Sequence, residues 1–256
     1  MQQEIKLEDI ELDKIVGIAQ EAGDAIMEIY NQDFLVEYKD NQSPLTKADI
    51  KSNEIICARL NSLYPNIPIL SEENRAVEYN KRKNWNYFWL IDPIDGTKEF
   101  IKKNGEFTVN VALIEKNRPV LGVVYVPVLK DTYCAKKGEG AFKNGQKLPL
   151  FINENSKISL KVVASKSHLS KETQDFIDNL ESENIEQVSR GSSLKLCMVA
   201  EGSADIYPRL APTMEWDTGA ADAIVRESGK MSYQFENKEP ILYNKENLLN
   251  PWFVVQ

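Results

Sequence analysis

The spacing of apolar residues changes several times along the first third of the chain, and each spacing predicts a different element. From Leu7 to Tyr30 apolar residues recur every three or four positions, which is typical of an amphipathic helix. A short strand is predicted at 34–38, and a second helical pattern covers 43–65, where Pro65 ends it. The apolar run at 67–70 predicts a buried strand. The charged stretch at 75–83 predicts an exposed loop or helical turn.

The middle of the chain alternates apolar and polar residues with a period of two. Three segments show this alternation, FTVNVALIE from Phe107, VLGVVYVP from Val120 and DTYCAKKGEGAFKNG from Asp131. Asn-Arg-Pro, Gly and Asn-Gly turn signals separate or interrupt them. We therefore predict an antiparallel meander.

Strand and helix patterns alternate in the last hundred residues. A strand at 160–165, a helix at 170–180 and a strand at 185–189 are followed by further segments of both kinds, and a helix is predicted from Asp217 to its stop at Gly229. The change from meander to alternation falls near NENSK. We therefore predict an α+β domain over residues 1–158 and an α/β domain over 159–256.

Composition narrows the function classes. Lys and Arg total 31 of the 256 residues and Asp and Glu total 39, giving a net charge of -8 that disfavours binding of a nucleic acid polymer. Cys57, Cys134 and Cys197 lie far apart, so we expect buried free thiols and neither a zinc site nor a disulfide framework. The single histidine, His168, excludes a histidine-rich metal site.

The chain shows no signal for a membrane span. No run approaches ~18 apolar residues, and the first residues are acidic rather than basic and then apolar. We expect a soluble, cytoplasmic protein without a signal peptide, and leave peripheral association with the inner face of the cell membrane open. A monomer is expected, with a homodimer as the alternative.

The stretch FWLIDPIDGTKEF, residues 88–100, carries the strongest chemical signal. An apolar run ends in Asp92 and Asp95, and Pro93 between them stiffens the loop so that the carbonyl of Ile94 can face the carboxylates. Carboxylate and carbonyl oxygens suit a hard cation such as Mg2+. An equally good reading of this pair alone is a helix cap and a surface acid.

Three further acidic motifs follow apolar segments or open helices. They are LSEEN with Glu72 and Glu73, TKAD with Asp49, and EWDTGAAD with Asp217. The ordinary reading of Asp49 and Asp217 is an N-terminal helix cap worth ~1 kcal/mol. Capping does not explain why such acids accompany a stiff DPIDGT loop, and we therefore favour a metal site.

DPIDGTKEF and WDTGAADAIVRESG, preceded by SEE and PLTKAD, resemble the signatures of the Mg2+-dependent, lithium-sensitive phosphatases of the inositol monophosphatase superfamily. Two further segments, GSSLKLCMVAEGSADIYPRLAPTMEWDT and YNKENLLNPWF, resemble its CysQ-type 3'(2'),5'-bisphosphate nucleotidases. The resemblance covers nearly the whole chain. It implies a layered α/β/α/β/α sandwich of the inositol monophosphatase and fructose-1,6-bisphosphatase type.

The resemblance also implies metal ligands and catalytic groups. Glu72, Asp92 and the Ile94 carbonyl would hold one Mg2+, and Asp92, Asp95 and Asp217 a second, while Glu72 faces a loosely bound third ion. Two such ions would activate a water and stabilise the leaving oxygen. Thr97 and Asp49 would relay the proton from that water. Glu73 is expected behind these ligands, orienting them.

The implied substrate is 3'-phosphoadenosine 5'-phosphate, a by-product of sulfate assimilation and sulfotransfer, whose 3'-phosphate is hydrolysed. Gly96 and Thr97 would hold phosphate oxygens through backbone N–H groups. Lys195 and Arg209 would neutralise the second phosphate. The full implied set of substrate-contacting residues is Glu72, Ile94, Asp95, Gly96, Thr97, His168, Ser192, Lys195, Arg209 and Asp217.

Two features bear on the choice of substrate and on rival functions. Gly229 is followed by Lys230 where the superfamily usually has a second glycine, a local departure that leaves the metal ligands untouched. A cation at Arg209, where an inositol-cleaving relative would carry an acid, favours a substrate with a second phosphate. The alternatives are an inositol or sugar monophosphatase and, in another class, a non-catalytic nucleotide-binding protein.

Overall fold

The structure is a computed structural model, and it describes residues 5–31, 37–38, 44–45, 47–74, 77–153, 159–165 and 170–256. No helix within these ranges is long and apolar enough to cross a lipid bilayer. The elements in chain order are η1 (Leu7–Asp9), α1 (Leu12–Tyr30), β1 (Glu37–Tyr38), β2 (Pro44–Leu45), α2 (Lys47–Leu63), β3 (Ile69–Ser71), η2 (Glu72–Asn74), α3 (Tyr79–Arg82), β4 (Tyr87–Asp95), α4 (Thr97–Ile101), β5 (Thr108–Glu115), β6 (Arg118–Val126), β7 (Asp131–Lys136), β8 (Gly140–Lys143), β9 (Gln146–Lys147), β10 (Ser159–Ser165), α5 (Lys171–Asp178), β11 (Asn184–Arg190), α6 (Leu194–Glu201), β12 (Tyr207–Arg209), α7 (Gly219–Glu227), β13 (Ser232–Gln234) and β14 (Phe253–Val255).

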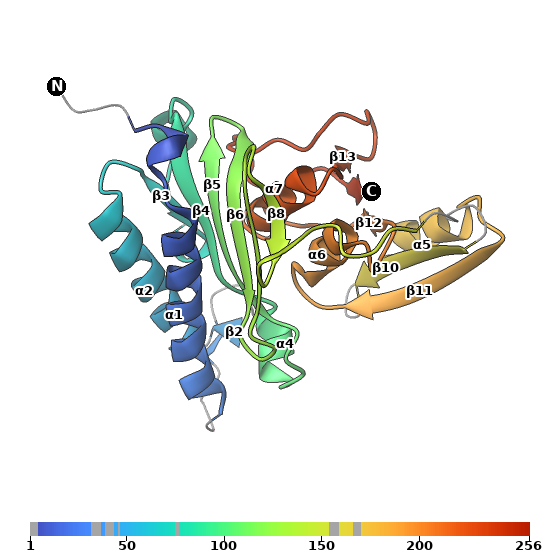
Figure 1. The fold of residues 1–256 in the computed structure, drawn as a ribbon, viewed down its shortest axis with the longest axis horizontal. Helices are drawn as coiled ribbons and strands as arrows, with labels where there is room; N and C mark the ends of the chain where they lie inside the picture. The colour runs from blue at the N-terminus through green and yellow to red at the C-terminus, as the bar shows by residue number, and fades with distance from the viewer. Residues whose placement is uncertain are drawn as a thin grey trace.

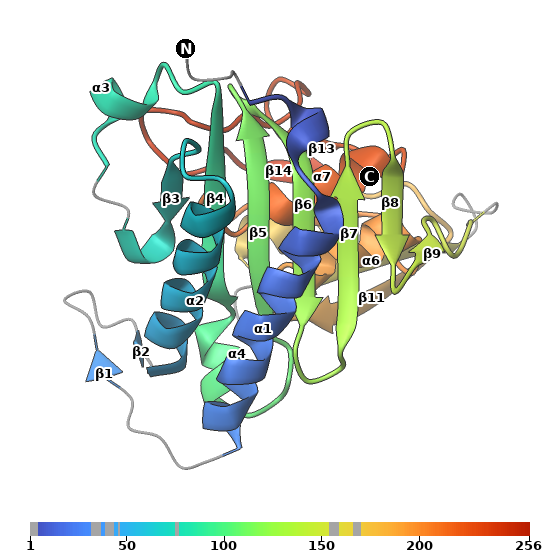
Figure 2. The same ribbon diagram turned by 60° about the vertical axis from the view of Figure 1, so that its left-hand side comes forward.

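A seven-stranded sheet in the order β3-β4-β5-β6-β7-β8-β9 forms the centre of the molecule. Strands β3 and β4 pair in parallel and all later neighbours are antiparallel, which confirms the predicted meander. Side chains alternate between its faces: Trp89 and Ile91 pack in the core under α1 and α2, while Phe88 and Leu90 pack in the core shared with α6 and α7. Figure 2 shows α1 and α2 crossing one face with α7 behind the sheet.

A second, smaller layer of strands, made of two short sheets, lies beyond α6 and α7. Its strands β10 and β11 pair in parallel, and β12, β14 and β13 pair antiparallel, with an isolated bridge between Val162 and Ile206 joining the two groups. Val163 packs toward α6 and α7, whereas its neighbours Val162 and Ala164 pack in a separate core with Ile177 of α5. Figure 1 therefore shows five layers from α1 and α2 to α5. The layered sandwich expected from the resemblance is confirmed.

Two predicted helices begin later than their sequence patterns indicate. Leu7–Asp9 forms a separate 3-10 turn, and the first long helix begins at Leu12. The last long helix begins at Gly219 rather than at Asp217, so Asp217 lies in the turn before it. The carboxylate of Asp217 accepts a hydrogen bond from the N–H of Met214, which precedes it, and so does not cap the helix that follows.

The predicted exposure of the 75–83 stretch is wrong for Arg82. Its side chain is buried, and its guanidinium donates to Asn244 Oδ1 and to the Glu246 carbonyl, both at 2.9 Å. These contacts tie α3 to the C-terminal part of the chain. The charge pattern could not reveal them, because the partners lie more than 160 residues away.

Helix α7 lies so close to the large sheet that only glycine fits beneath it. A Cβ built on Gly122 of β6 would lie 2.0 Å from the carbonyl oxygen of Ala220. The helix belongs to the last third of the chain but packs on strands from the first half.

The proposed division at residue 158 stays a prediction, and residues 154–158 lie outside the described ranges.

Candidate active site

Three carboxylates from distant parts of the chain meet between the large sheet and α7. Asp92 and Asp95 come from the end of β4, and Asp217 comes from the turn that precedes α7. Each offers an oxygen, and these oxygens all lie within 4.8 Å of one another. Such a set of oxygens has the size and chemistry of a divalent cation site.

An irregularity in β4 brings both of its aspartates to this place. Asp92 pairs with Asn110 and Asp95 with Thr108, so Pro93 and Ile94 together oppose the single residue between those two partners. In a regular strand, residues three apart point to opposite faces. The extra residue therefore re-aims the strand end, as bulges beside functional sites commonly do.

Hydrogen bonds from helix α2 hold this end of β4 and the end of the neighbouring strand β3. The hydroxyl of Ser52 donates to the Pro93 carbonyl at 2.9 Å, and Asn53 Oδ1 accepts from the Ser71 hydroxyl at 2.7 Å. Ser71 ends β3, and Glu72 follows it directly. Asp49 lies in the first turn of α2 and is buried, so one helix holds Asp49, the DPID loop and the strand that presents Glu72 in fixed relation.

Asp92 is the most strongly perturbed acid of the cluster. Burial raises its pKa well above the ordinary value, and the charges of Glu72, Asp95, Asp217 and Asp49 raise it further, in that order. Its Oδ1 atom is buried and has no hydrogen-bond partner among the described residues. An unpaired buried oxygen among five acids needs either a proton or a cation, and a metal ion therefore fits these residues.

The other two carboxylates are also shifted toward the protonated form. Burial raises the pKa of Asp95, while the charge of Lys195 and hydrogen bonds from Ser193 oppose the change. Burial, followed by the charge of Asp95, raises the pKa of Asp217 to about 8, although the N–H of Met214 at 2.8 Å lowers it. A cation that binds here must displace these protons.

A buried polar network that the sequence analysis did not identify lies beside Asp95. Ser193 Oγ is 2.8 Å from Asp95 Oδ2 and 2.7 Å from the Asp217 carbonyl, so its one proton serves one of two acceptors. Asn110 Nδ2 donates to Ser193 Oγ at 2.9 Å, and Thr108 donates to Asn110 Oδ1 at 3.0 Å. Ser193 thereby links two candidate ligands from different halves of the chain. Its place within GSSLK was the only available signal.

Two cations lie next to the acid cluster. Lys195 in α6 is only 5% exposed, and its ammonium donates to the Ser192 carbonyl at 2.5 Å. Burial lowers the pKa of Lys195 to about 8, with the Asp95 charge opposing and the Arg209 charge adding to the effect. Arg209 in β12 donates to Thr213 Oγ1 at 2.5 Å and to the Pro212 carbonyl at 3.0 Å.

Two residues around these cations adopt left-handed backbone conformations. Ser192 has a φ of 45°, and its buried Oγ has no hydrogen-bond partner within the described part of the chain. Gly96 has a φ of 93°, and a Cβ there would lie 3.3 Å from both the Glu106 carbonyl and the Ser192 Cβ. Backbone strain and unpaired polar atoms of this kind concentrate at functional sites.

Thr97 opens α4, a helix of only five residues. Its hydroxyl lies 3.5 Å from the Ile94 carbonyl, which is the outer limit of a hydrogen bond. Glu73 lies in η2, and its N–H donates to Ser71 Oγ at 3.3 Å. His168 lies outside the described residues. The roles assigned to all these residues stay predictions.

The structure brings most of the predicted site residues together. Burial and mutual charge effects place the following residues in one cluster: Asp49, Glu72, Asp92, Asp95, Lys195, Arg209 and Asp217.

A model of the inositol monophosphatase family matches residues 9–251 of this chain. The chain belongs to the inositol monophosphatase family. The family is metal-dependent, generally on Mg2+. Among its members, the 3'(2'),5'-bisphosphate nucleotidase CysQ of Salmonella typhimurium is 44% identical over 246 residues, or 95% of this chain and 98% of that protein. CysQ of Escherichia coli K12 is 42% identical over 247 residues and has the same coverage.

Solved structures of the inositol monophosphatase family share the fold. CysQ from Bacteroides thetaiotaomicron superposes with a TM-score of 0.86 at 44% identity, covering 96% of each chain. The Thermotoga maritima IMPase superposes with a TM-score of 0.77 at 26% identity, covering 96% of this chain and 91% of that one. The family assignment thus rests on sequence and fold together, and the resemblance inferred from the sequence is confirmed.

Proposed function

We propose that this chain is a Mg2+-dependent phosphomonoesterase that converts adenosine 3',5'-bisphosphate to AMP and phosphate. The observation that carries the proposal is the cluster of Asp92, Asp95 and Asp217, with oxygens within 4.8 Å, beside the buried cation Lys195. Relatives named 3'(2'),5'-bisphosphate nucleotidase at 42–44% identity, spanning 95% of this chain, support the choice of reaction.

The acid cluster would hold two ions. Glu72, Asp92 and the Ile94 carbonyl suit the first, and Asp92, Asp95 and Asp217 suit the second, with a third near Glu72 at high Mg2+ concentration. When bound, the ions supply charge neutralisation for the phosphate and acidify a water. The protein's part is to hold the carboxylates at a fixed spacing, and Ser193, Ser52 and Met214 do so through the hydrogen bonds described above.

Proton transfer is assigned to Thr97 and Asp49. The Thr97 hydroxyl orients the attacking water, and Asp49 accepts the proton through that hydroxyl. The water oxygen would form the new bond to phosphorus while the bond to the ribose 3'-oxygen breaks, and that oxygen would take up a proton from solvent water to leave as the 3'-hydroxyl. Asp49 is buried, and the contribution of its charge to the raised pKa of Asp92 indicates that it lies near the cluster. A buried carboxylate is a more effective base than a solvated one.

Substrate recognition is assigned to two cations and to backbone N–H groups. Lys195 and Arg209 would neutralise the second phosphate, which the net charge of -8 makes necessary for an anionic substrate. Gly96 and Thr97 would hold the reacting phosphate through backbone N–H groups. Ser192 Oγ, buried and without a partner among the described residues, would donate to the nucleotide, and His168 would contact the adenine.

The test is release of phosphate from adenosine 3',5'-bisphosphate by wild type and by Asp92→Asn, with and without Mg2+, followed by chromatography of the product. We expect adenosine 5'-monophosphate, no release without Mg2+, and inhibition by Li+. Formation of adenosine 3'-monophosphate would contradict the assigned bond. Full activity of Asp92→Asn would contradict the metal-assisted reaction and favour a contaminating phosphatase.

Two rival functions make different predictions for the same experiment. An inositol or sugar monophosphatase would need no cation for a second phosphate, so Lys195→Met would leave its activity intact. A non-catalytic nucleotide-binding protein would bind the bisphosphate and release no phosphate. The proximity of Asp49 to Asp92 supports catalysis over simple binding, because a binding module has no need of a proton acceptor.

A further inference from the structure

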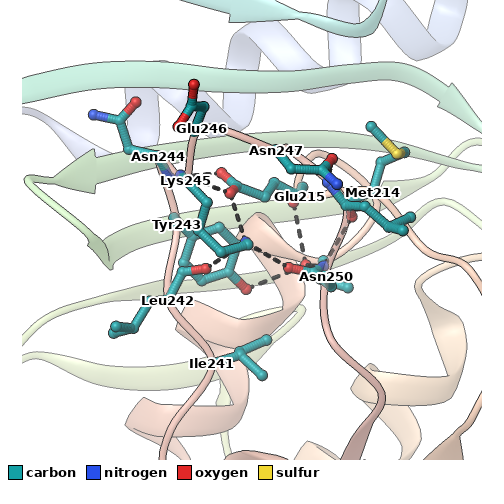
Figure 3. Close-up of polar contacts among 12 residues, drawn as sticks. Met214, Glu215, Ile241, Leu242, Tyr243, Asn244, Lys245, Glu246, Asn247 and Asn250 are labelled. Carbon is teal, nitrogen blue, oxygen red and sulfur yellow. Dashed lines mark hydrogen bonds and ion pairs between the residues drawn. The ribbon is translucent and has the colours of Figure 1, made fainter. Parts of the chain in front are cut away.

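A polar network on the C-terminal segment 243–250 surrounds Glu215, two residues before Asp217 (Figure 3). Glu215 is fully buried, and its carboxylate accepts from the Asn244 N–H at 2.6 Å, the Lys245 N–H at 3.0 Å and the Lys245 ammonium at 2.6 Å. The same ammonium donates to Asn250 Oδ1 at 3.1 Å. The proposed reaction uses none of these residues.

The peptide unit between Thr213 and Met214 connects this network to the acid cluster. Its carbonyl, on Thr213, accepts from the Asn250 N–H at 2.9 Å, and its N–H, on Met214, donates to Asp217 Oδ2 at 2.8 Å. Hydrogen bonds to the two ends of one peptide group polarise each other. This bond from the Asn250 backbone therefore orients and strengthens the donor that Asp217 receives, whereas the Asn250 side chain acts on the next peptide unit.

The next peptide unit is held from the same segment. The side-chain amide of Asn250 donates to the Met214 carbonyl at 3.0 Å, and the Glu215 N–H donates to the Leu248 carbonyl at 2.9 Å. Both peptide planes that flank Met214 are thus fixed by residues 248–250. Met214 and Leu249 form an isolated antiparallel bridge at this point.

The orientation of the Asn250 amide is itself determined. Its oxygen accepts from Lys245, and its nitrogen donates both to the Met214 carbonyl and to Thr218 Oγ1 at 3.0 Å. If the amide were flipped, its oxygen would face the Met214 carbonyl and Thr218 Oγ1, and its NH2 group would face the Lys245 ammonium. Glu215 in turn holds Lys245, so the ion pair fixes the amide in the orientation that supports Met214.

We propose that Asn250, oriented by the Glu215 and Lys245 pair, is a positioning residue that holds Asp217 in place for metal binding. The inference rests on the proposed metal site, to which Asp217 belongs. Residues that orient metal ligands in this way typically change metal affinity by roughly 10-fold to 100-fold when they are replaced.

The experiment measures Mg2+ binding by calorimetry for wild type and Asn250→Ala. Asn244→Ala is the matched control, because it removes a buried asparagine of the same segment whose side chain bonds to Arg82 and not to the turn that carries Asp217. We expect Asn250→Ala to bind Mg2+ about 10-fold or more weakly, with the KM for the nucleotide nearly unchanged at saturating Mg2+. Asn244→Ala should lower the melting temperature and keep the wild-type Mg2+ affinity.

A double-mutant cycle decides whether Asn250 acts through Asp217. In an Asp217→Asn background, Asn250→Ala should cause little further loss of Mg2+ affinity. Wild-type affinity in Asn250→Ala, or equal losses in both backgrounds, would overturn the inference. If Asn250→Ala does not fold, Asn250→Leu, which has a similar shape and no hydrogen-bond donor, gives the same comparison. Failure of the wild type to bind Mg2+ would instead overturn the proposed function itself.

Discussion

At the scale of single residues, Asp92 decides whether the site holds a proton or a metal ion. Because burial and four neighbouring acids already favour its neutral form, Asp92→Asn should leave the melting temperature of the metal-free protein equal or slightly higher. The same change should reduce phosphate release at least about 100-fold, beyond the usual loss for residues that only orient a ligand. Asp178→Asn, an exposed acid at the end of α5, is the control and should change neither quantity.

Asp217 makes the site dependent on pH. The pKa of Asp217 is about 8 in the folded metal-free protein, above its ordinary value of 3.8, so the folded state retains a proton that the unfolded state releases. The metal-free protein should therefore lose stability as the pH rises from about 4 to about 8. Mg2+ must displace this proton, so its affinity should rise over the same range and level off above pH 8.

Calorimetry in two buffers of different ionisation enthalpy checks this pH dependence. Mg2+ binding at pH 7 should release protons, and binding at pH 9 should release few. A Mg2+ affinity that does not change between pH 6 and pH 8 would contradict the assignment of Asp217 as a ligand.

Ser193 should matter for stability and for metal binding together. Ser193→Ala removes the one donor that the Asp95 carboxylate and the Asp217 carbonyl share, and the acceptor of the Asn110 amide, at a cost of about 1–3 kcal/mol in the free energy of unfolding. Chemical denaturation measures that cost. Ser228→Ala removes a hydroxyl that follows α7 and donates, among the described residues, only to the Val225 carbonyl, so this change should cost less and keep wild-type Mg2+ affinity.

The sequence allowed some site residues to be predicted and not others, for a physical reason. Asp92, Asp95 and Asp217 belong to contiguous motifs, and such motifs can be recognised from the sequence alone. Ser193 and Asn110 act through a hydrogen bond between residues 83 positions apart, and neither side chain differs locally from an ordinary polar one. Such pairs become visible only when strands and helices are placed.

At the scale of elements, the close contact between β6 and α7 positions Asp217. Gly122→Ala would place a methyl group 2.0 Å from the Ala220 carbonyl and must push α7 off the sheet. We expect a loss of about 1–3 kcal/mol in the free energy of unfolding, together with weaker Mg2+ binding. Gly17→Ala is the matched control, because a Cβ there meets nothing within 4 Å and alanine favours the helix by up to about 1 kcal/mol.

If Gly122→Ala lowers the stability without weakening Mg2+ binding, the claim that the packing of α7 on β6 positions Asp217 is contradicted. Denaturation and metal titration of both glycine variants provide the two measurements.

Periodicity predicted most elements and missed their ends. The meander and the succession of strand, helix and strand over β10, α5 and β11 follow from patterns of apolar residues. The start of α7 was misplaced because Asp217 has the residue type of a helix cap, while its carboxylate accepts instead from the preceding Met214. A cap and a metal ligand cannot be distinguished until the hydrogen-bond donor is known.

At the scale of the whole molecule, the acid cluster should couple metal binding to stability. Five acids close together repel one another unless cations or protons neutralise them. At a Mg2+ concentration 100 times the dissociation constant, binding should add about 2.7 kcal/mol to the free energy of unfolding. A melting temperature measured at pH 8 in Mg2+ and in chelator checks this, and equal values would contradict the site.

The arrangement of layers was the least accessible part of the fold from local pattern. Strand β14, the last of the chain, lies between β12 and β13, which both precede it in sequence. No local signal predicts such an insertion, since it depends on which edges remain open after earlier strands have paired. The family resemblance supplied the five layers, and the alternation of core residues in β4 and β10 is consistent with them.

The most direct test of the whole account is kcat/KM for adenosine 3',5'-bisphosphate, adenosine 3'-monophosphate and inositol 1-phosphate, measured side by side in Mg2+ with wild type and Lys195→Met. We predict that wild type prefers the bisphosphate and that Lys195→Met loses most of that preference, because the second phosphate then lacks its buried cation. A higher kcat/KM for inositol 1-phosphate in wild type would contradict the nucleotidase assignment.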